Sequence, residues 1–121
     1  MFKIALFFLL PVWIACQAES IKLADLITKT IEYQYGESIY HVTMDSDHTL
    51  HWEAIAGEEK GIKATETYKA EMIGKNLVFI TWSEENGIGV SQVLDFGKGI
   101  VYNHLIKGRD ISIGKGKIRF L

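Results

Sequence analysis

The sequence predicts an all-β fold, an up-and-down antiparallel meander closed into a small barrel of seven or eight strands, with one short N-terminal helix. Two observations predict it. Short segments rich in β-branched and aromatic residues recur at near-regular intervals after residue 36. Turn residues, mostly Gly, Asn, Asp and Lys, separate these segments. Closing such a meander removes its exposed edges, so a barrel is the expected architecture.

The first 18 residues have the features of a secretory signal peptide. Lys3 gives a positive start, an apolar run extends from Ile4 to Ala15, and small residues precede a cleavage point after Ala18. Pro11 interrupts the run, which is shorter than the roughly 20 apolar residues of a membrane-spanning helix. We expect a signal peptide at 1–18, one domain at 19–121, no membrane span, and export to the periplasm or the medium.

Cys16 is the only cysteine, so a disulfide framework is excluded and stability must come from packing. Two interpretations of Cys16 stay open. It is discarded with the signal peptide, or it carries a lipid anchor, since Ile14 and Ala15 precede it.

Charge argues against one class of partner. Without residues 1–18 the chain keeps 12 basic and 15 acidic residues, and its lysines are scattered. The basic patch typical of nucleic-acid binders is missing, so no nucleic-acid partner is expected.

The segment after residue 19 is the best helix candidate. Ser20 or Asp25 provides a cap, and apolar residues recur at spacings of three and four. The residues on this apolar side are Leu23, Leu26, Ile27 and Ile31. We expect a short amphipathic helix packed over the mouth of the barrel.

Seven segments have the pattern of strands. They are Ile39–Met44, Thr49–Ile55, Ala64–Ile73, Leu77–Ser83, Val90–Phe96, Ile100–Ile106 and Ile111–Leu121. The Gly-Lys-Gly sequences at Gly97–Gly99 and Gly114–Gly116 are interpreted as hairpin turns and not as phosphate-binding loops.

The hairpin from Asn76 to Phe96 carries a family resemblance. Its strands end in Trp82-Ser83-Glu84 and in Val93-Leu94-Asp95, and Tyr68 and Thr49–Glu53 precede it. This pattern resembles the MoaF-like family, which is related to lipocalins. The resemblance implies a single calycin-type, lipocalin-like barrel and brings no established reaction and no cofactor. The signal peptide departs from a cytoplasmic role in cofactor metabolism.

The four histidines are candidate metal ligands or bases. His48 and His51 follow Asp45 and Asp47 in a possible metal loop, but residues three apart in a strand face opposite sides. Asp residues also favour turns, so a solvated turn and no metal is expected. His41 and His104 lie in mid-strand, where each projects into a cavity or is satisfied by a neighbour.

The candidate ligand-binding residues are mainly aromatic, because such side chains line small-molecule pockets as well as cores. They are Trp52, Tyr68, Phe79, Trp82, Tyr102 and, as a polar partner, His104. Several strands are apolar on both faces, so the sequence leaves open whether Phe79 or Trp82 faces the interior.

We therefore expect an exported, lipocalin-like domain that binds a small apolar or aromatic ligand in an aromatic-lined cavity. Two alternatives remain. One is an enzyme that uses Glu84, Asp95 or His104 for acid/base chemistry, although no nucleophile–base pair is evident. The other is a non-catalytic interaction protein of the cell envelope. The plainest interpretation of Glu84 and Asp95 is that they belong to solvated turns.

Overall fold

The computed structural model describes residues 20–121. The predicted signal peptide at 1–18, with Cys16, lies outside the described residues. Among those described, no helix is long and apolar enough to span a membrane.

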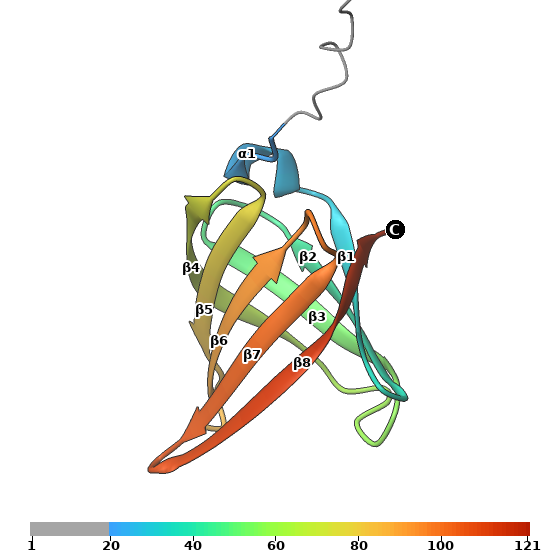
Figure 1. Cartoon of the computed structure of the whole chain (residues 1–121). Helices are drawn as coiled ribbons and strands as arrows, with labels where there is room; N and C mark the ends of the chain where they lie inside the picture. Colours follow the sequence, from blue (N-terminus) through green and yellow to red (C-terminus); the bar gives the residue numbers. More distant parts are fainter. Residues whose placement is uncertain (1–19) are drawn as a thin grey trace, which may run out of the picture.

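Residues 20–121 form one short helix followed by eight antiparallel strands that close into a barrel in sequence order (Figure 1). The elements are α1 (Leu23–Leu26), β1 (Thr30–Tyr35), β2 (Ser38–Met44), β3 (Thr49–Ala56), β4 (Lys63–Gly74), β5 (Leu77–Ser83), β6 (Gly89–Asp95), β7 (Ile100–Lys107) and β8 (Asp110–Phe120). The predicted fold class is confirmed, and the seven predicted strands correspond to β2–β8.

The eighth strand, β1, lies in a region where the sequence pattern partly predicts a helix. The helix ends at Leu26, and Thr28 has a positive φ of 70°, which breaks helical geometry. Ile31 therefore belongs to β1, where it is fully buried. Its alternation with Tyr33 and Tyr35 gives β1 an inward face, which the helical spacing obscures.

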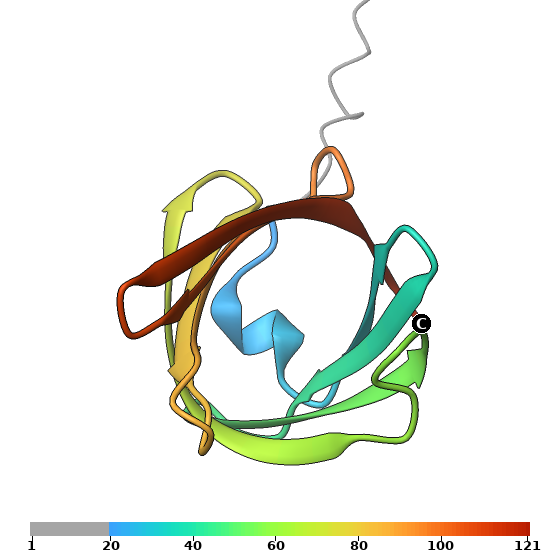
Figure 2. The ribbon, with the colours of Figure 1, turned by 90° about the horizontal axis from the view of Figure 1, so that it is seen from below.

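Helix α1 closes one end of the barrel, as predicted. Viewed through the opposite, open end, α1 lies across the far end of the ring (Figure 2). Leu26 is buried in the core, Thr28 N–H donates to the Met44 carbonyl, and Ile21 N–H donates to Asn76 Oδ1. These contacts fix α1 to the turns at that end, which we call the plugged end.

The interior changes character along the barrel axis. Near the plugged end the inward side chains are aliphatic or Met and fully buried; they include Ile31, Met44, Leu50, Val78, Ile80, Leu94 and Val101. Toward the open end the same strands present Tyr, Trp, Gln and Asn. Dense packing therefore fills one half, and the other half is available for a cavity.

The second Gly-Lys-Gly sequence is not a turn, contrary to the prediction. Gly114 and Gly116 lie within β8, opposite Asn103 and Val101 of β7. A Cβ on Gly116 would lie 2.7 Å from Tyr35 Cδ1 and 2.6 Å from the Gln34 carbonyl oxygen. Glycine is required at this position because the Tyr35 ring packs directly on the backbone.

We predict that Gly116→Ala lowers the free energy of unfolding by about 1–3 kcal/mol, because the new methyl group overpacks the contact with Tyr35. Gly114→Ala is the matched control. Its Cβ would meet nothing closer than 3.8 Å, so its effect should stay within about 0.5 kcal/mol. Urea denaturation measures both values, and equal effects would contradict the explanation.

Candidate functional site

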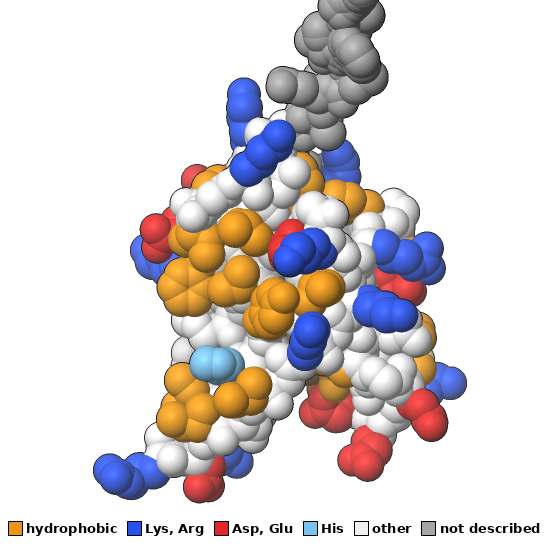
Figure 3. Space-filling model, in the orientation of Figure 1, with side chains coloured by type: hydrophobic (Ala, Val, Ile, Leu, Met, Phe, Trp, Pro, Cys, Tyr) orange, Lys and Arg blue, Asp and Glu red, His pale blue; other side chains and the backbone are white. Residues whose placement is uncertain are grey.

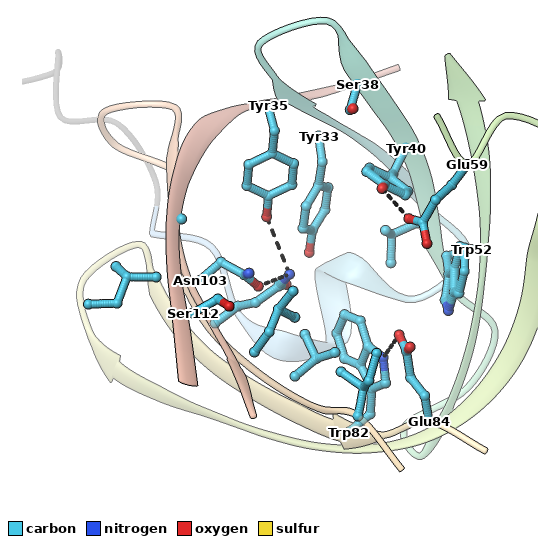
Figure 4. Close-up of a pocket in the computed structure, with 17 residues that line it drawn as sticks. Tyr33, Tyr35, Ser38, Tyr40, Trp52, Glu59, Trp82, Glu84, Asn103 and Ser112 are labelled. Atoms are coloured by element: carbon cyan, nitrogen blue, oxygen red, sulfur yellow. Dashed lines mark hydrogen bonds between the residues drawn. The ribbon is translucent and has the colours of Figure 1, made fainter. Parts of the chain in front are cut away.

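A cavity of about 330 Å³ occupies the open half of the barrel (Figure 4). Inward side chains from β1, β2, β3, β5, β6, β7 and β8 line it, and Glu59 of the β3–β4 loop and Glu84 after β5 lie at its rim. Within the described residues, the plugged end is packed, and the cavity lies toward the open end.

Aromatic rings form a continuous wall of this cavity. Tyr33 and Tyr35 have ring centroids 6.4 Å apart, Tyr35 and Tyr40 are 6.2 Å apart, and Tyr40 and Trp52 are 6.1 Å apart. The last two pairs meet edge to face, a favourable aromatic geometry. Trp82, on β5, is a further aromatic residue of the lining. These residues give apolar contact area in fixed positions.

Carboxylates accept hydrogen bonds from the polar groups of these aromatic side chains. Trp82 Nε1 donates to Glu84 at 3.2 Å, the Tyr40 hydroxyl donates to Glu59, and Trp52 Nε1 donates to the buried Glu66 at 2.9 Å. Each bond fixes the rotamer of an aromatic side chain.

Burial raises the pKa of Glu84 above its usual range, and the like charges of Glu66 and Glu59 add to this effect. The hydrogen bond from Trp82 acts in the opposite direction. The predicted solvated turn at Glu84 is thus wrong in part, because this carboxyl is only half-exposed and points toward the cavity (Figure 4). Burial also raises the pKa of Tyr33 and Tyr35, so both phenols stay neutral.

The side of the cavity facing these carboxylates carries amides and phenols. Gln92 Nε2 donates to Asn103 Oδ1 at 2.9 Å and lies 3.5 Å from the Tyr35 hydroxyl. Two buried polar atoms within the described residues have no hydrogen-bond partner, the Tyr33 hydroxyl and Gln92 Oε1. Such atoms are rare in folded proteins, and leaving them unpaired costs free energy.

Trp52 and Trp82 are the two predicted site residues that line the cavity. The choice between Phe79 and Trp82 is thereby settled, since Trp82 faces inward. Tyr68 is also inside the barrel but near the plugged end, where its hydroxyl donates to the Ser46 carbonyl at 2.7 Å. This hydrogen bond connects β4 to the β2–β3 turn, so Tyr68 stabilises the fold and does not line the cavity.

Phe79, Tyr102 and His104 lie on the outer face of the barrel and do not line the cavity. Phe79 and Tyr102 are 38% and 41% exposed, and both are paired with Val93 across neighbouring strands. Lys115 Nζ lies 5.7 Å above the Tyr102 ring. Figure 3 shows hydrophobic side chains gathered on this face, over β5–β8, with lysine and arginine among them. These strands are apolar on both faces, which explains the ambiguity in the sequence.

The three residues named for acid/base chemistry are not brought together. Asp95 Oδ1 accepts the Lys98 N–H at 2.9 Å in the turn after β6, at the plugged end. The outward His104 lies on the other side of the sheet, so only Glu84 reaches the cavity.

The other histidines form surface pairs with carboxylates. His41 contacts Glu32 at 3.0 Å, and His51 contacts Asp45 at 2.8 Å. His48 contacts Asp47 at 2.7 Å in the predicted turn. Across residues 20–121, no three His, Cys, Asp or Glu side chains are grouped so as to hold a metal ion.

The predicted set of site residues omits several residues that line the cavity. They are Tyr33, Tyr35, Tyr40, Glu59, Gln92 and Asn103. Gln92 and Asn103 carry a usable signal, because each interrupts an otherwise apolar alternation, between Val90 and Leu94 and between Val101 and Leu105. A polar residue at an inward position of a small barrel indicates a hydrogen-bonded interior or a ligand site.

Fold and cavity together define a small, closed, eight-stranded β-barrel protein with one plugged and one open end. The model of the family described as MoaF-like matches residues 27–119. The chain belongs to the MoaF-like family, as its hairpin pattern suggests.

Solved structures show the same fold. One of them, described as a candidate beta-lactamase from Burkholderia vietnamiensis, has a TM-score of 0.74 and 19% sequence identity, and the match covers 79% of this chain and 95% of that one. At this identity the likeness concerns the fold alone. A search of curated proteins gives no match to this chain.

We predict that Glu84→Gln stabilises the protein in a pH-dependent manner. Since the pKa of Glu84 is raised on folding, the folded state holds this proton more tightly than the unfolded state. Stability of the native chain is thus lost as pH rises from about 4.3, the unfolded value, through the folded pKa, and the variant escapes that loss. The glutamine oxygen can still accept from Trp82.

The measurement is the unfolding free energy of both proteins between pH 4 and pH 8. The advantage of Glu84→Gln should grow with pH and then level off. Glu85→Gln, at an exposed neighbour, controls for the removal of one negative charge. An advantage that is constant over this range would contradict the assignment.

Proposed function

We propose that this barrel is a small-molecule-binding domain whose cavity takes up a small ligand with an apolar or aromatic body. The observation that carries the proposal is the open, aromatic-walled cavity of about 330 Å³ opposite the plugged end. This volume is at the lower end of the range of typical ligand pockets, which are mostly apolar with a few placed polar groups. The hydrogen bonds that fix Trp52, Trp82 and Tyr40 mean that the wall is largely formed before a ligand arrives.

Tryptophan fluorescence tests this proposal directly. The chain has three tryptophans, and in a Trp13→Phe variant the two that remain, Trp52 and Trp82, both line the cavity. We expect the uncharged probe phenylnaphthylamine to quench their emission saturably, with one probe bound per chain.

A matched pair of variants on β6 locates the binding. Val90 faces the cavity and Val93 faces outward, opposite Phe79. Val90→Phe should weaken probe binding at least several-fold by filling the cavity, whereas Val93→Phe should leave it unchanged. The proposal fails if no saturable quenching occurs, or if the two variants weaken binding equally.

We further propose that the domain works outside the cytoplasm. The charge of Lys3, the apolar run at 4–15 and the small residues before position 19 support export. In a Gram-negative host the full-length gene should yield periplasmic protein that starts at Glu19, or at a lipidated Cys16. Intact mass and cell fractionation distinguish these outcomes. Leu9→Arg, which places a charge in the apolar run, should leave an uncleaved cytoplasmic protein. An uncleaved native chain in the cytoplasm would contradict export.

An enzymatic role rests on Glu84 alone among the three residues named for acid/base chemistry. Its raised pKa favours a proton donor or acceptor within the cavity. The beta-lactamase description belongs to the structural neighbour and, at 19% identity, lends this chain no activity.

A further inference from the structure

We propose that the ligand of this cavity is an organic cation, a protonated or quaternary amine on a small apolar body, held between the Glu59 and Glu84 carboxylates and the surrounding aromatic rings. This inference rests on the proposed binding function and specifies the chemistry of the ligand.

The charge of the cavity is one-sided. Glu59 and Glu84 line it, and Glu66 lies behind Trp52, to whose indole N–H it is bonded. Of the described residues that line the cavity, none is Lys, Arg or His. An anionic ligand would therefore meet repulsion, whereas a cation would find its counter-charges already in place.

Within residues 20–121, these carboxylates lack the cationic partners that other carboxylates have. On the outer face, Glu32 pairs with both His41 and Arg119, and Asp45 pairs with His51. No such ion pair involves Glu59, Glu66 or Glu84 within the part of the chain that the structure describes. The mutual repulsion that contributes to the raised pKa of Glu84 is consistent with a missing positive charge.

The aromatic wall suits an organic cation better than a neutral apolar ligand. The close-up shows the carboxylates of Glu59 and Glu84 projecting beside Tyr40, Trp52 and Trp82 (Figure 4). Rings of Trp and Tyr attract a cation placed over their faces, and the attraction increases where water is excluded. A bare metal ion is a poorer fit, because metal ions need several converging ligands and residues 20–121 hold no such group.

Two unpartnered atoms give this site an independent marker for a ligand. Tyr33 is 1% exposed and Gln92 is 5% exposed, and both residues line the cavity. The Tyr33 hydroxyl and Gln92 Oε1 have no partner within the described residues. Both can accept hydrogen bonds, so a ligand that donates through N–H or O–H groups would satisfy them.

The test compares three ligands that share a phenyl body and differ in charge: phenethylamine, phenethyl alcohol and phenylpropionate. Each displaces phenylnaphthylamine from the full chain near pH 7, where the amine is protonated and the propionate ionised. We expect the amine to bind about tenfold more tightly than the alcohol and the propionate to bind most weakly.

A double variant, Glu59→Gln with Glu84→Gln, assigns this preference to the two carboxylates. The ratio between amine and alcohol affinities should fall to within about threefold. The control, Glu58→Gln with Glu85→Gln, removes two negative charges from exposed neighbours and should keep the ratio near its original value. Thermal unfolding of each variant verifies that it is folded.

The outcomes separate the two proposals. If phenylnaphthylamine binds but the alcohol or the propionate competes as well as the amine, the cation preference is wrong and the cavity remains a binding site. The assignment to Glu59 and Glu84 is equally wrong if the control pair abolishes the preference as fully as the cavity pair. If neither phenylnaphthylamine nor any of the three ligands binds, both proposals fall.

Discussion

Closure of the sheet between β1 and β8 is the constraint on which the rest of the structure depends. Glu32 lies opposite Arg119 and Tyr33 lies opposite Ile118, and the Leu121 N–H donates to the Thr30 carbonyl. Once these strands pair, alternate residues of every strand must share one interior. An eight-stranded interior is narrow, so each inward side chain either fills the core or borders a small cavity. Closure of the barrel thus determines which residues of each alternating strand line the interior.

The same closure couples stability to the cavity. Gly116 lies in β8, and Tyr35 lies in the adjoining strand β1, with its ring against the Gly116 backbone. Tyr35 is held in this position and extends the aromatic wall toward Tyr40. At the other end, α1 and the Tyr68–Ser46 hydrogen bond close the barrel. Packing is concentrated at the plugged end, which leaves the open end free for polar and aromatic side chains.

Much of the fold could be predicted because strand periodicity and turn residues are local signals. The strands after residue 36 have such signals, and so does the family resemblance of the hairpin. The β1 strand was hidden because Leu23, Leu26, Ile27 and Ile31 also fit a helical spacing. The contacts that favour a strand over a helix here are not local in the sequence. Ile27 forms a bridge with Met44, and Ile31 pairs with Val42, both across sequence-distant backbone.

Less of the candidate site could be predicted, because its membership depends on which face of each strand turns inward. In β5, Phe79 and Trp82 are both large and aromatic, and only the closed sheet places Trp82 inside. Glu59 was also beyond reach, since it comes from a loop that folds back over the open end and bonds to Tyr40. The position of Glu59 at the cavity depends on tertiary structure, and no local sequence pattern predicts it.

The polar residues inside the barrel give the strongest physical argument for the proposed binding function. Leucine or valine at positions 66, 92 and 103 would fill the interior without desolvating a charge or leaving an amide oxygen unbonded. The native chain has Glu66, Gln92 and Asn103 there, all at most 9% exposed. Hydrogen bonds to Trp52 and between the two amides offset part of this cost, but Gln92 Oε1 stays unsatisfied. A fold that needed only a stable core would gain from replacing these side chains. Gln92 and Asn103 border the cavity and do not lie in the packed half, which supports the proposal that a bound molecule offsets the remaining cost.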